Sequence, residues 1–133
     1  MAEPMQVEVV SADRVVWSGE SSNVIAKTTD GEIGILPGHA PVLAVLQPSA
    51  VVIFCEDGRR EIIAVEGGFI SVSRGRVSIL SEYARLSSEM SVAQAERELA
   101  EAQRALDTGD ATDEDHRRFD RANAQLRAAQ KAQ

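Results

Sequence analysis

The hydrophobic periodicity of the chain changes once, near residue 87, and this change separates two kinds of segment. Before it, short apolar or alternating runs are bounded by turn residues, which is typical of half-buried strands. From Ser91 onward there is no proline, and the good helix formers Ala, Glu, Gln, Arg and Leu dominate. We therefore predict a β domain over residues 1–87 and a helical domain over residues 88–133.

The sequence of the first domain predicts many short strands at regular spacing. The expected strands are Met5–Val10, Val15–Trp17, Val24–Ala26, Val51–Cys55, Ile62–Val65, Phe69–Val72 and Val77–Leu80. Glycine permits the positive φ that tight turns need, and turn dipeptides of this kind stand at Asp30-Gly31, Pro37-Gly38, Asp57-Gly58, Gly67-Gly68 and Arg74-Gly75. This pattern favours an antiparallel β-sandwich or a flattened barrel.

The second domain reads as two amphipathic helices joined by a short turn. Ser91 and Gln94 have the spacing of a capping box, so the first helix is expected to begin there. Gly109 lies in the break, and Thr112 or Asp113 can cap the second helix. The apolar positions advance by three and four: Val92, Ala95, Leu99, Ala102 and Leu106, then Phe119, Ala122, Leu126 and Ala129. The pattern predicts an antiparallel hairpin with an alanine-rich seam, weak enough to detach and rearrange.

Charge is unevenly distributed along the 133 residues, which carry 21 acidic and 14 basic side chains and a net charge of −7. This balance argues against a dedicated nucleic-acid surface, which needs a clustered positive field. Residues 112–133, however, hold five basic side chains against four acidic ones. The basic side chains are Arg117, Arg118, Arg121, Arg127 and Lys131. Such a basic island is either a solvated helix face or a contact for an acidic partner.

Sequence motifs for catalysis and for cofactors are missing. The glycine-rich stretch 31–38 is followed by His39, without the Lys and Ser/Thr of a phosphate-binding loop. Two isolated histidines and the single Cys55 cannot build a three-histidine metal centre, a four-cysteine zinc site or an internal disulfide. We expect a protein without cofactor, catalytic residues or a membrane-spanning segment, and we expect Cys55 to be packed rather than reactive.

One segment carries a family resemblance. Residues 31–43, Gly-Glu-Ile-Gly-Ile-Leu-Pro-Gly-His-Ala-Pro-Val-Leu, resemble the signature of the epsilon subunit of F-type ATP synthases. The opening Val7–Ser11, the Glu66–Phe69 and Val77–Leu80 strand pair and the alanine-rich terminal hairpin agree with it in the same order. The resemblance covers essentially the whole chain.

The resemblance implies a flattened sandwich of about ten strands followed by a two-helix arm on the rotating central stalk. The sandwich would bind the gamma subunit and rest on the c-ring, with Glu32 facing the c-ring and His39 in the same loop. The arm would extend into the alpha/beta catalytic head and restrain ATP hydrolysis, where the five basic side chains would meet an acidic segment of the beta subunit. The chain would be a non-catalytic, peripheral subunit at the cytoplasmic face of a bacterial plasma membrane.

One departure from the family concerns nucleotide binding. Some bacterial epsilon subunits bind ATP through an Asp and an Arg where the first helix begins, and here Ser91 and Gln94 stand at those positions. Ser91 keeps the capping role, but the charged groups are lost. Weak or no ATP binding is expected. A free-standing nucleotide sensor and an enzyme built on the sandwich are the alternatives, and the second lacks any catalytic constellation.

Overall fold

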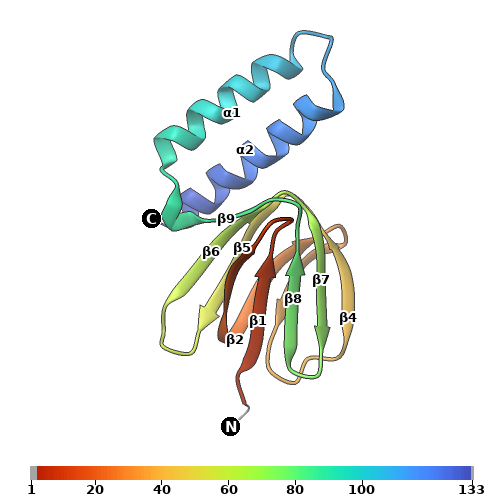
Figure 1. Cartoon of the computed structure of the whole chain (residues 1–133), viewed down its shortest axis with the longest axis vertical. Coiled ribbons are helices and arrows are strands. Elements are labelled where there is room, and N and C mark those ends of the chain that lie inside the picture. The colour runs from red at the N-terminus through yellow and green to blue at the C-terminus, as the bar shows by residue number, and fades with distance from the viewer. Residues whose placement is uncertain (1–2, 133) are drawn as a thin grey trace.

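The computed structural model describes residues 3–132 as a nine-stranded β structure followed by a short 3-10 turn and two α-helices (Figure 1). The strands are β1 (Met5–Val10), β2 (Val15–Thr28), β3 (Gly31–Ile35), β4 (Val42–Leu46), β5 (Ser49–Cys55), β6 (Arg60–Val65), β7 (Gly68–Ser73), β8 (Arg76–Leu80) and β9 (Ala84–Leu86). The 3-10 turn η1 spans Ser87–Glu89, and the helices are α1 (Val92–Leu106) and α2 (Asp113–Lys131).

Strand β2 belongs to both layers of the sandwich. Its first half, residues 15–21, pairs with β1, whereas residues 21–28 pair with β3 and β5. One layer is therefore β2–β1–β8–β7–β4, and the other is β3–β2–β5–β6–β9. The predicted sandwich is confirmed, and its ten strands are obtained when the two halves of β2 are counted separately. The pairing of β1 with β8 is parallel, a local exception to the antiparallel prediction.

The hydrophobic core fills the space between the two layers. Alternate residues of each strand point inward, and the largest fully buried side chains include Ile35, Ile53, Ile63, Ile70 and Ile79. Cys55 lies at the edge of this core, where burial, and then the nearby carboxylates Glu61 and Asp57, raise the pKa of its thiol. A neutral, buried thiol is a packing group, as expected from its position in the sequence.

The outer face of the β3–β2–β5–β6–β9 layer is apolar as well, because helix α2 covers it. Val52, Ile62 and Ala64 point outward and pack against Ala124 and Ala128 of α2. Strands that are buried on both faces have continuous apolar sequences, and β5 and β6 have sequences of this kind. Helix α2 lies between the sandwich and α1, so α1 is the outer helix of the arm (Figure 1).

The helical hairpin forms as predicted, with caps at the expected residues. The Ser91 hydroxyl accepts a hydrogen bond from the Gln94 backbone N–H at 3.1 Å. Thr112 and Asp115 form a full capping box, and its hydrogen bonds hold the pKa of the Asp115 carboxyl below its usual value. The alanine seam is confirmed by buried Ala95 and Ala102 in α1, together with Ala122 and Ala129 in α2.

Three strands were not expected from the sequence. Strand β3 contains two glycines in five residues and β4 follows two prolines, so turn-forming residues mask the strand character of both segments. Strand β9 is only three residues long and is held by its pairing with β6. Strand β2 was read as two separate runs, because its middle, residues 18–23, is polar.

Gly68 supplies a test of the tight junction between β7 and β8. Its φ is +104°, and a Cβ placed there would lie 1.9 Å from the Leu80 carbonyl oxygen. Backbone strain and overlap with another backbone together predict that Gly68→Ala lowers the free energy of unfolding by about 3 kcal/mol or more. Urea denaturation measures this loss.

Gly75→Ala is the matched control. Gly75 also has a positive φ, +77°, but a Cβ there meets no atom within 4 Å. Its cost should be limited to the left-handed conformation, about 1 kcal/mol. Equal losses for the two variants would show that the contact with Leu80 is unimportant.

Candidate interaction surfaces

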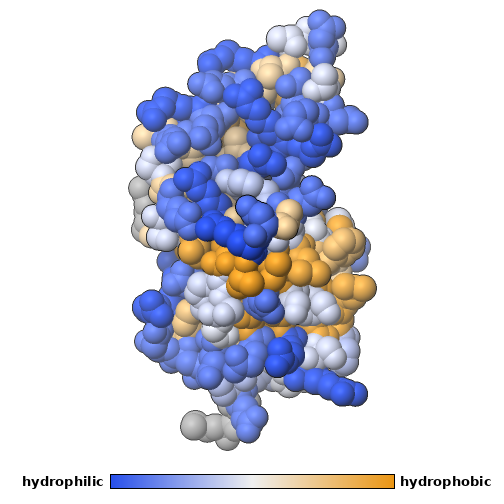
Figure 2. Space-filling model, viewed as in Figure 1, coloured by the Kyte–Doolittle hydropathy of each residue, from blue (hydrophilic) through white to orange (hydrophobic). Residues whose placement is uncertain are grey.

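The outer face of the β2–β1–β8–β7–β4 layer carries an uncovered line of apolar side chains. Strand register places Val45 beside Phe69, Phe69 beside Leu80, Leu80 beside Val10, and Val10 beside Val15. These five residues, called the apolar row, cross five strands at one end of the layer. In Figure 2 hydrophobic surface gathers directly below the helical arm, over these strands.

The apolar row is exposed although its members are large. Val15, Val45, Phe69 and Leu80 each keep between 46% and 54% of their surface accessible, and neighbouring Leu43 keeps 72%. Inward-facing neighbours in the same strands are buried, so packing in the core does not explain these outward residues. Contiguous exposed apolar surface of this kind marks a contact site for another macromolecule. The apolar row was not predicted from the sequence, since alternation along a strand does not show which outer residues are left uncovered.

The basic island is divided among different surroundings rather than presented as one free face. Arg118 Nη2 pairs with Glu101 Oε2 of α1 at 3.4 Å, and Arg117 pairs with Glu114 at 2.7 Å, one turn away on α2. All four of these side chains are more than half exposed, so each pair is worth little in free energy. Both guanidinium groups remain available to a partner.

Arg127 and Lys131 lie at the other end of α2, beside a groove of about 390 Å³ between the helix and the sandwich. Lys27 and Glu32 of strands β2 and β3 line the same groove. Within residues 3–132 neither Arg127 nor Lys131 forms an ion pair. Lys27 adds a third positive charge to this lining, against the single carboxylate of Glu32.

Arg121 is the member of the basic island that forms an ion pair with the sandwich in the described part of the chain. Its Nη2 donates to Glu66 Oε2 at 3.0 Å, and its guanidinium lies 4.4 Å from the centre of the Tyr83 ring. One turn further along α2, the side-chain amide of buried Gln125 donates to the Tyr83 hydroxyl at 2.9 Å. The roles of Glu66, Tyr83 and Gln125 were not predicted from the sequence, in which the one signal is a glutamine among the alanines of the second helix.

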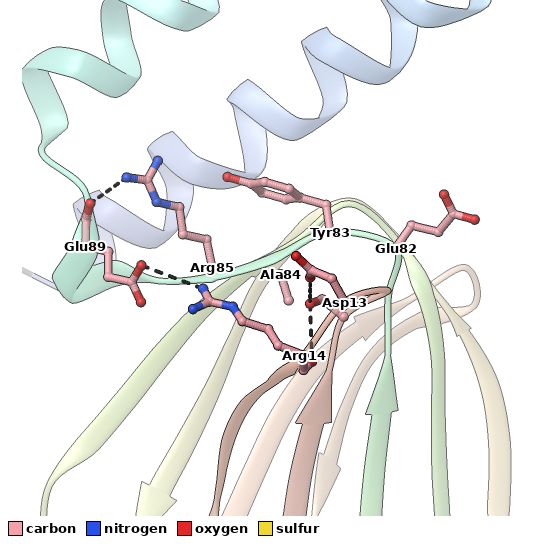
Figure 3. A pocket seen from close by; sticks show the side chains of 8 residues that line it. Asp13, Arg14, Glu82, Tyr83, Ala84, Arg85 and Glu89 are labelled. Atoms are coloured by element: carbon pink, nitrogen blue, oxygen red, sulfur yellow. Dashed lines mark hydrogen bonds and ion pairs between the residues drawn. The ribbon is translucent and has the colours of Figure 1, made fainter.

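The arm leaves the sandwich beside a pocket of about 460 Å³ formed by the β1–β2 turn, β9 and η1 (Figure 3). Arg85 Nη2 donates to the Glu89 backbone carbonyl at 2.7 Å, and Arg14 pairs loosely with the Glu89 carboxylate at 3.8 Å. Figure 3 shows the side chains of Tyr83, which precedes β9, and of Arg85, which lies in β9, on the side of the sandwich that faces α2. Arg14 and Arg85 both contact Glu89 of η1, so the pocket is a junction between arm and sandwich.

The expectation that Glu32 and His39 share one loop was wrong. Glu32 lies in strand β3, opposite Lys27 of β2, because the Gly31–Ile35 segment is long enough to complete the sheet edge. His39 lies in the connection between β3 and β4, near the other end of β3, and its Nδ1 is 2.7 Å from the Ala40 carbonyl oxygen. Glu32 is exposed and His39 is half-buried, and they lie in different elements.

Other kinds of site find no support in the described part of the chain. Among residues 3–132, no three His, Cys, Asp or Glu side chains gather where they could hold a metal ion. Neither α1 nor α2 is long and apolar enough to cross a membrane. Gln94, at the position where the family pattern has Arg, directs its amide to Glu98 on α1 at 3.2 Å.

Solved structures with a similar fold come from mitochondrial ATP synthases. A chain of the Euglena gracilis ATP synthase assembly of OSCP, F1 and c-ring superimposes with a TM-score of 0.78 at 20% identity, covering 97% of this chain and 80% of that one. A chain of the Tetrahymena thermophila central stalk and c-ring superimposes with a TM-score of 0.54 at 18% identity, covering 66% of this chain and 70% of that one. At these identities the likeness shows the fold.

Sequence relatives are ATP synthase epsilon chains of actinobacteria. That of Cutibacterium acnes is 58% identical over 69 residues, 52% of this chain and 47% of the relative, and that of Streptomyces avermitilis is 54% identical over 71 residues, 53% and 57%. The Frankia casuarinae chain is 48% identical over 70 residues, 53% and 82%. The chain thus matches about half the length of the first two relatives.

The match to a whole protein family is broader than these pairwise alignments. Residues 4–87 match the family described as ATP synthase, Delta/Epsilon chain, beta-sandwich domain. This range includes both layers of the sandwich, the Gly31–Leu43 segment and the apolar row. The chain belongs to the family of ATP synthase delta/epsilon chains.

Proposed function

We propose that this chain is the epsilon subunit of a rotary ATP synthase, a non-catalytic part of the central stalk that links the gamma subunit to the c-ring. The apolar row carries the proposal. One outer face of the sandwich is covered by the chain's own helix α2, whereas the other holds an uncovered apolar line from Val45 to Val15. A permanent subunit contact would bury that line.

The expected place in the assembly follows from family membership and from the names of the relatives. We propose that the gamma subunit covers the apolar row and that exposed Glu32 and half-buried His39 lie on the side of the c-ring. The chain would then sit peripherally at the cytoplasmic face of a bacterial plasma membrane. Because Glu32 and His39 lie near opposite ends of β3, they would contact the c-ring as two separate points.

The helical arm is proposed to restrain ATP hydrolysis. When it extends toward the alpha/beta catalytic head, Arg117, Arg118, Arg121, Arg127 and Lys131 would face an acidic segment of the beta subunit. Charge complementarity would orient that contact and speed its formation. The helix contributes only the small side chains Ala124 and Ala128 to its apolar contact with the sandwich, which supports an arm that can leave at a smaller cost than a leucine-rich face would impose.

A free-standing nucleotide sensor is the second candidate. It would fold its two helices around a nucleotide, and its charged ligands would stand at the start of α1. Ser91 and Gln94 occupy these positions, and both are engaged in local hydrogen bonds. The structure therefore favours the stalk subunit.

The docking role is tested at the apolar row. Phe69→Ser and Leu80→Ser should each weaken association with purified gamma subunit about tenfold, because each removes a large apolar contact. Surface plasmon resonance measures the affinity. Both residues are half exposed in the free chain, so the urea midpoint of the variants should change little.

Leu36→Ser is the control for this test. Leu36 is 58% exposed but lies in the β3–β4 connection, outside the apolar row. It should leave the affinity for gamma unchanged. Full affinity in the Phe69 and Leu80 variants would remove the basis of the proposed docking face.

The inhibitory role is tested by deleting residues 88–133. The assembled ATP synthase should then hydrolyse ATP severalfold faster while its subunit composition stays intact, because the arm no longer reaches the catalytic head. Replacing the five basic residues by Ala should reproduce part of this increase. An unchanged hydrolysis rate after the deletion would show that the arm does not inhibit.

Nucleotide binding is tested by calorimetric titration of the chain with ATP. We expect no binding in the micromolar range, because the positions that supply charge in the family motif are Ser91 and Gln94. The double variant Ser91→Asp, Gln94→Arg restores that charge and should bind ATP more tightly than its parent. Micromolar affinity of the unaltered chain would favour the sensor instead.

A further inference from the structure

The contact between α2 and the sandwich combines apolar packing against Val52 and Ile62 with two polar side chains of the helix. Ala124 and Ala128 are its buried apolar groups on the helix, and each contributes only a methyl group. Arg121 and Gln125 lie one turn apart on the same side of α2, and both reach Tyr83. Because hydrogen bonds are directional, the polar pair adds position-specific contacts to this apolar packing.

Arg121 is held by the sandwich, yet its hydrogen-bonding capacity is not used fully. Glu66, only 12% exposed, accepts one hydrogen bond from Arg121 Nη2, and the Arg121 guanidinium lies over the Tyr83 ring. The Nε of Arg121 is buried and has no hydrogen-bond partner. A buried donor without an acceptor costs free energy. A carboxylate that accepted from Nε and Nη2 together would satisfy the guanidinium better than Glu66 does.

The network continues from Tyr83 into the segment that connects the two domains. Gln125 Oε1 accepts from Arg85 Nη1 at 3.4 Å, and Arg85 also donates to the Glu89 carbonyl in η1. Moving Arg121 away from Glu66 therefore disturbs the contacts of α2 and those of the connecting segment at once. Arg121 is the only basic residue of the α2 island that holds α2 to a side-chain carboxylate of the sandwich within residues 3–132.

We propose that Arg121 binds one of two alternative sites. Glu66 and Tyr83 hold it in the folded arm, and the acidic segment of the beta subunit competes with them for it. In the folded arm the guanidinium belongs to Glu66, and in the extended arm it belongs to the partner. The regulatory half of this inference rests on the proposed inhibitory function. Glu66 is then a positioning residue that sets the fraction of folded arm, and Arg121 acts on both sides of the equilibrium.

The competition gives opposite signs to two substitutions. Glu66→Gln removes the charge that retains Arg121 in the sandwich while leaving Arg121 free for the partner, so inhibition should become stronger. Arg121→Gln weakens the folded arm too, but it also removes a group that the partner needs, so inhibition should become weaker. A purely structural role of the contact would move both variants in the same direction.

The folded-arm half is measured on the full chain alone. Hydrogen exchange of the α2 amides in Glu66→Gln should be faster than in the parent by about fivefold at low salt. The parent should approach the variant as salt is raised, because screening weakens the Arg121–Glu66 pair. Glu101→Gln is the matched control: it removes the Arg118 pair inside the arm and should leave the salt dependence of exchange unchanged.

Arg121→Lys separates charge from geometry. The lysine keeps the positive charge but cannot stack as a planar fork on Tyr83, so exchange should lie between the parent and Arg121→Gln. Circular dichroism establishes that each variant keeps its fold. Exchange in Glu66→Gln that equals the parent's at every salt concentration would overturn the proposal.

The regulatory half is measured on the assembled enzyme. Glu66→Gln should lower ATP hydrolysis about two- to fivefold and Arg121→Gln should raise it, by population shift in a two-state arm. If deletion of residues 88–133 changes hydrolysis but both variants shift it in the same direction, the competition is refuted and the inhibitory function stands. If the deletion has no effect, the inhibitory function fails and the regulatory half fails with it, whereas faster exchange in Glu66→Gln still upholds the role of Glu66 in the folded arm.

Discussion

Strand β2 is the constraint on which the rest of the structure depends. Because it hydrogen-bonds to β1 with one half and to β3 and β5 with the other, it fixes the two layers to each other. The shared strand also decides which faces point outward. One outer face meets α2, and the opposite one is left with the apolar row. The two interaction surfaces of the molecule are thus set by the path of one strand.

The two outer faces differ in the kind of contact that they offer. The apolar row presents Phe69, Leu80 and valines, which gain much from burial and lose much on exposure. The α2 face combines the packing of Val52 and Ile62 against helix alanines with a polar network around Tyr83, in which desolvation offsets much of the attraction. In the proposed function, the first face therefore suits a lasting contact, and the second suits a contact that breaks and forms again.

Sequence patterns predicted much of the fold where one interaction dominates locally. Continuous apolar runs revealed β5 and β6, and the Ser91 cap and Gly109 located the ends of the helices. Strand β3 escaped because its edge position relies on pairing with β2, a tertiary contact that overrides the low strand propensity of glycine. The buried face of α2 that holds Ala124 and Ala128 was not predicted either, because it is buried only by its tertiary contact with β5 and β6.

The interaction surfaces were less accessible to sequence reasoning. The basic island was visible as composition, but the partner of Arg121 lies 55 residues earlier in the chain, and no local pattern connects Arg121 to Glu66. The apolar row needs the register of five strands before its members become neighbours. Both features are products of topology rather than of periodicity.

Topology also explains why the arm's contact and its connecting segment act together. Tyr83 and Arg85 flank the first residue of β9, the short strand that ends the sandwich, and their side chains reach Gln125 in α2. The last strand of one domain thus supplies the docking groups for the other. A helix held by residues of its own connecting segment needs no long excursion to find its place again. In the proposed function, this proximity makes the return of the arm fast. The arm stays extended only when the partner binds Arg121 with more free energy than the sandwich does.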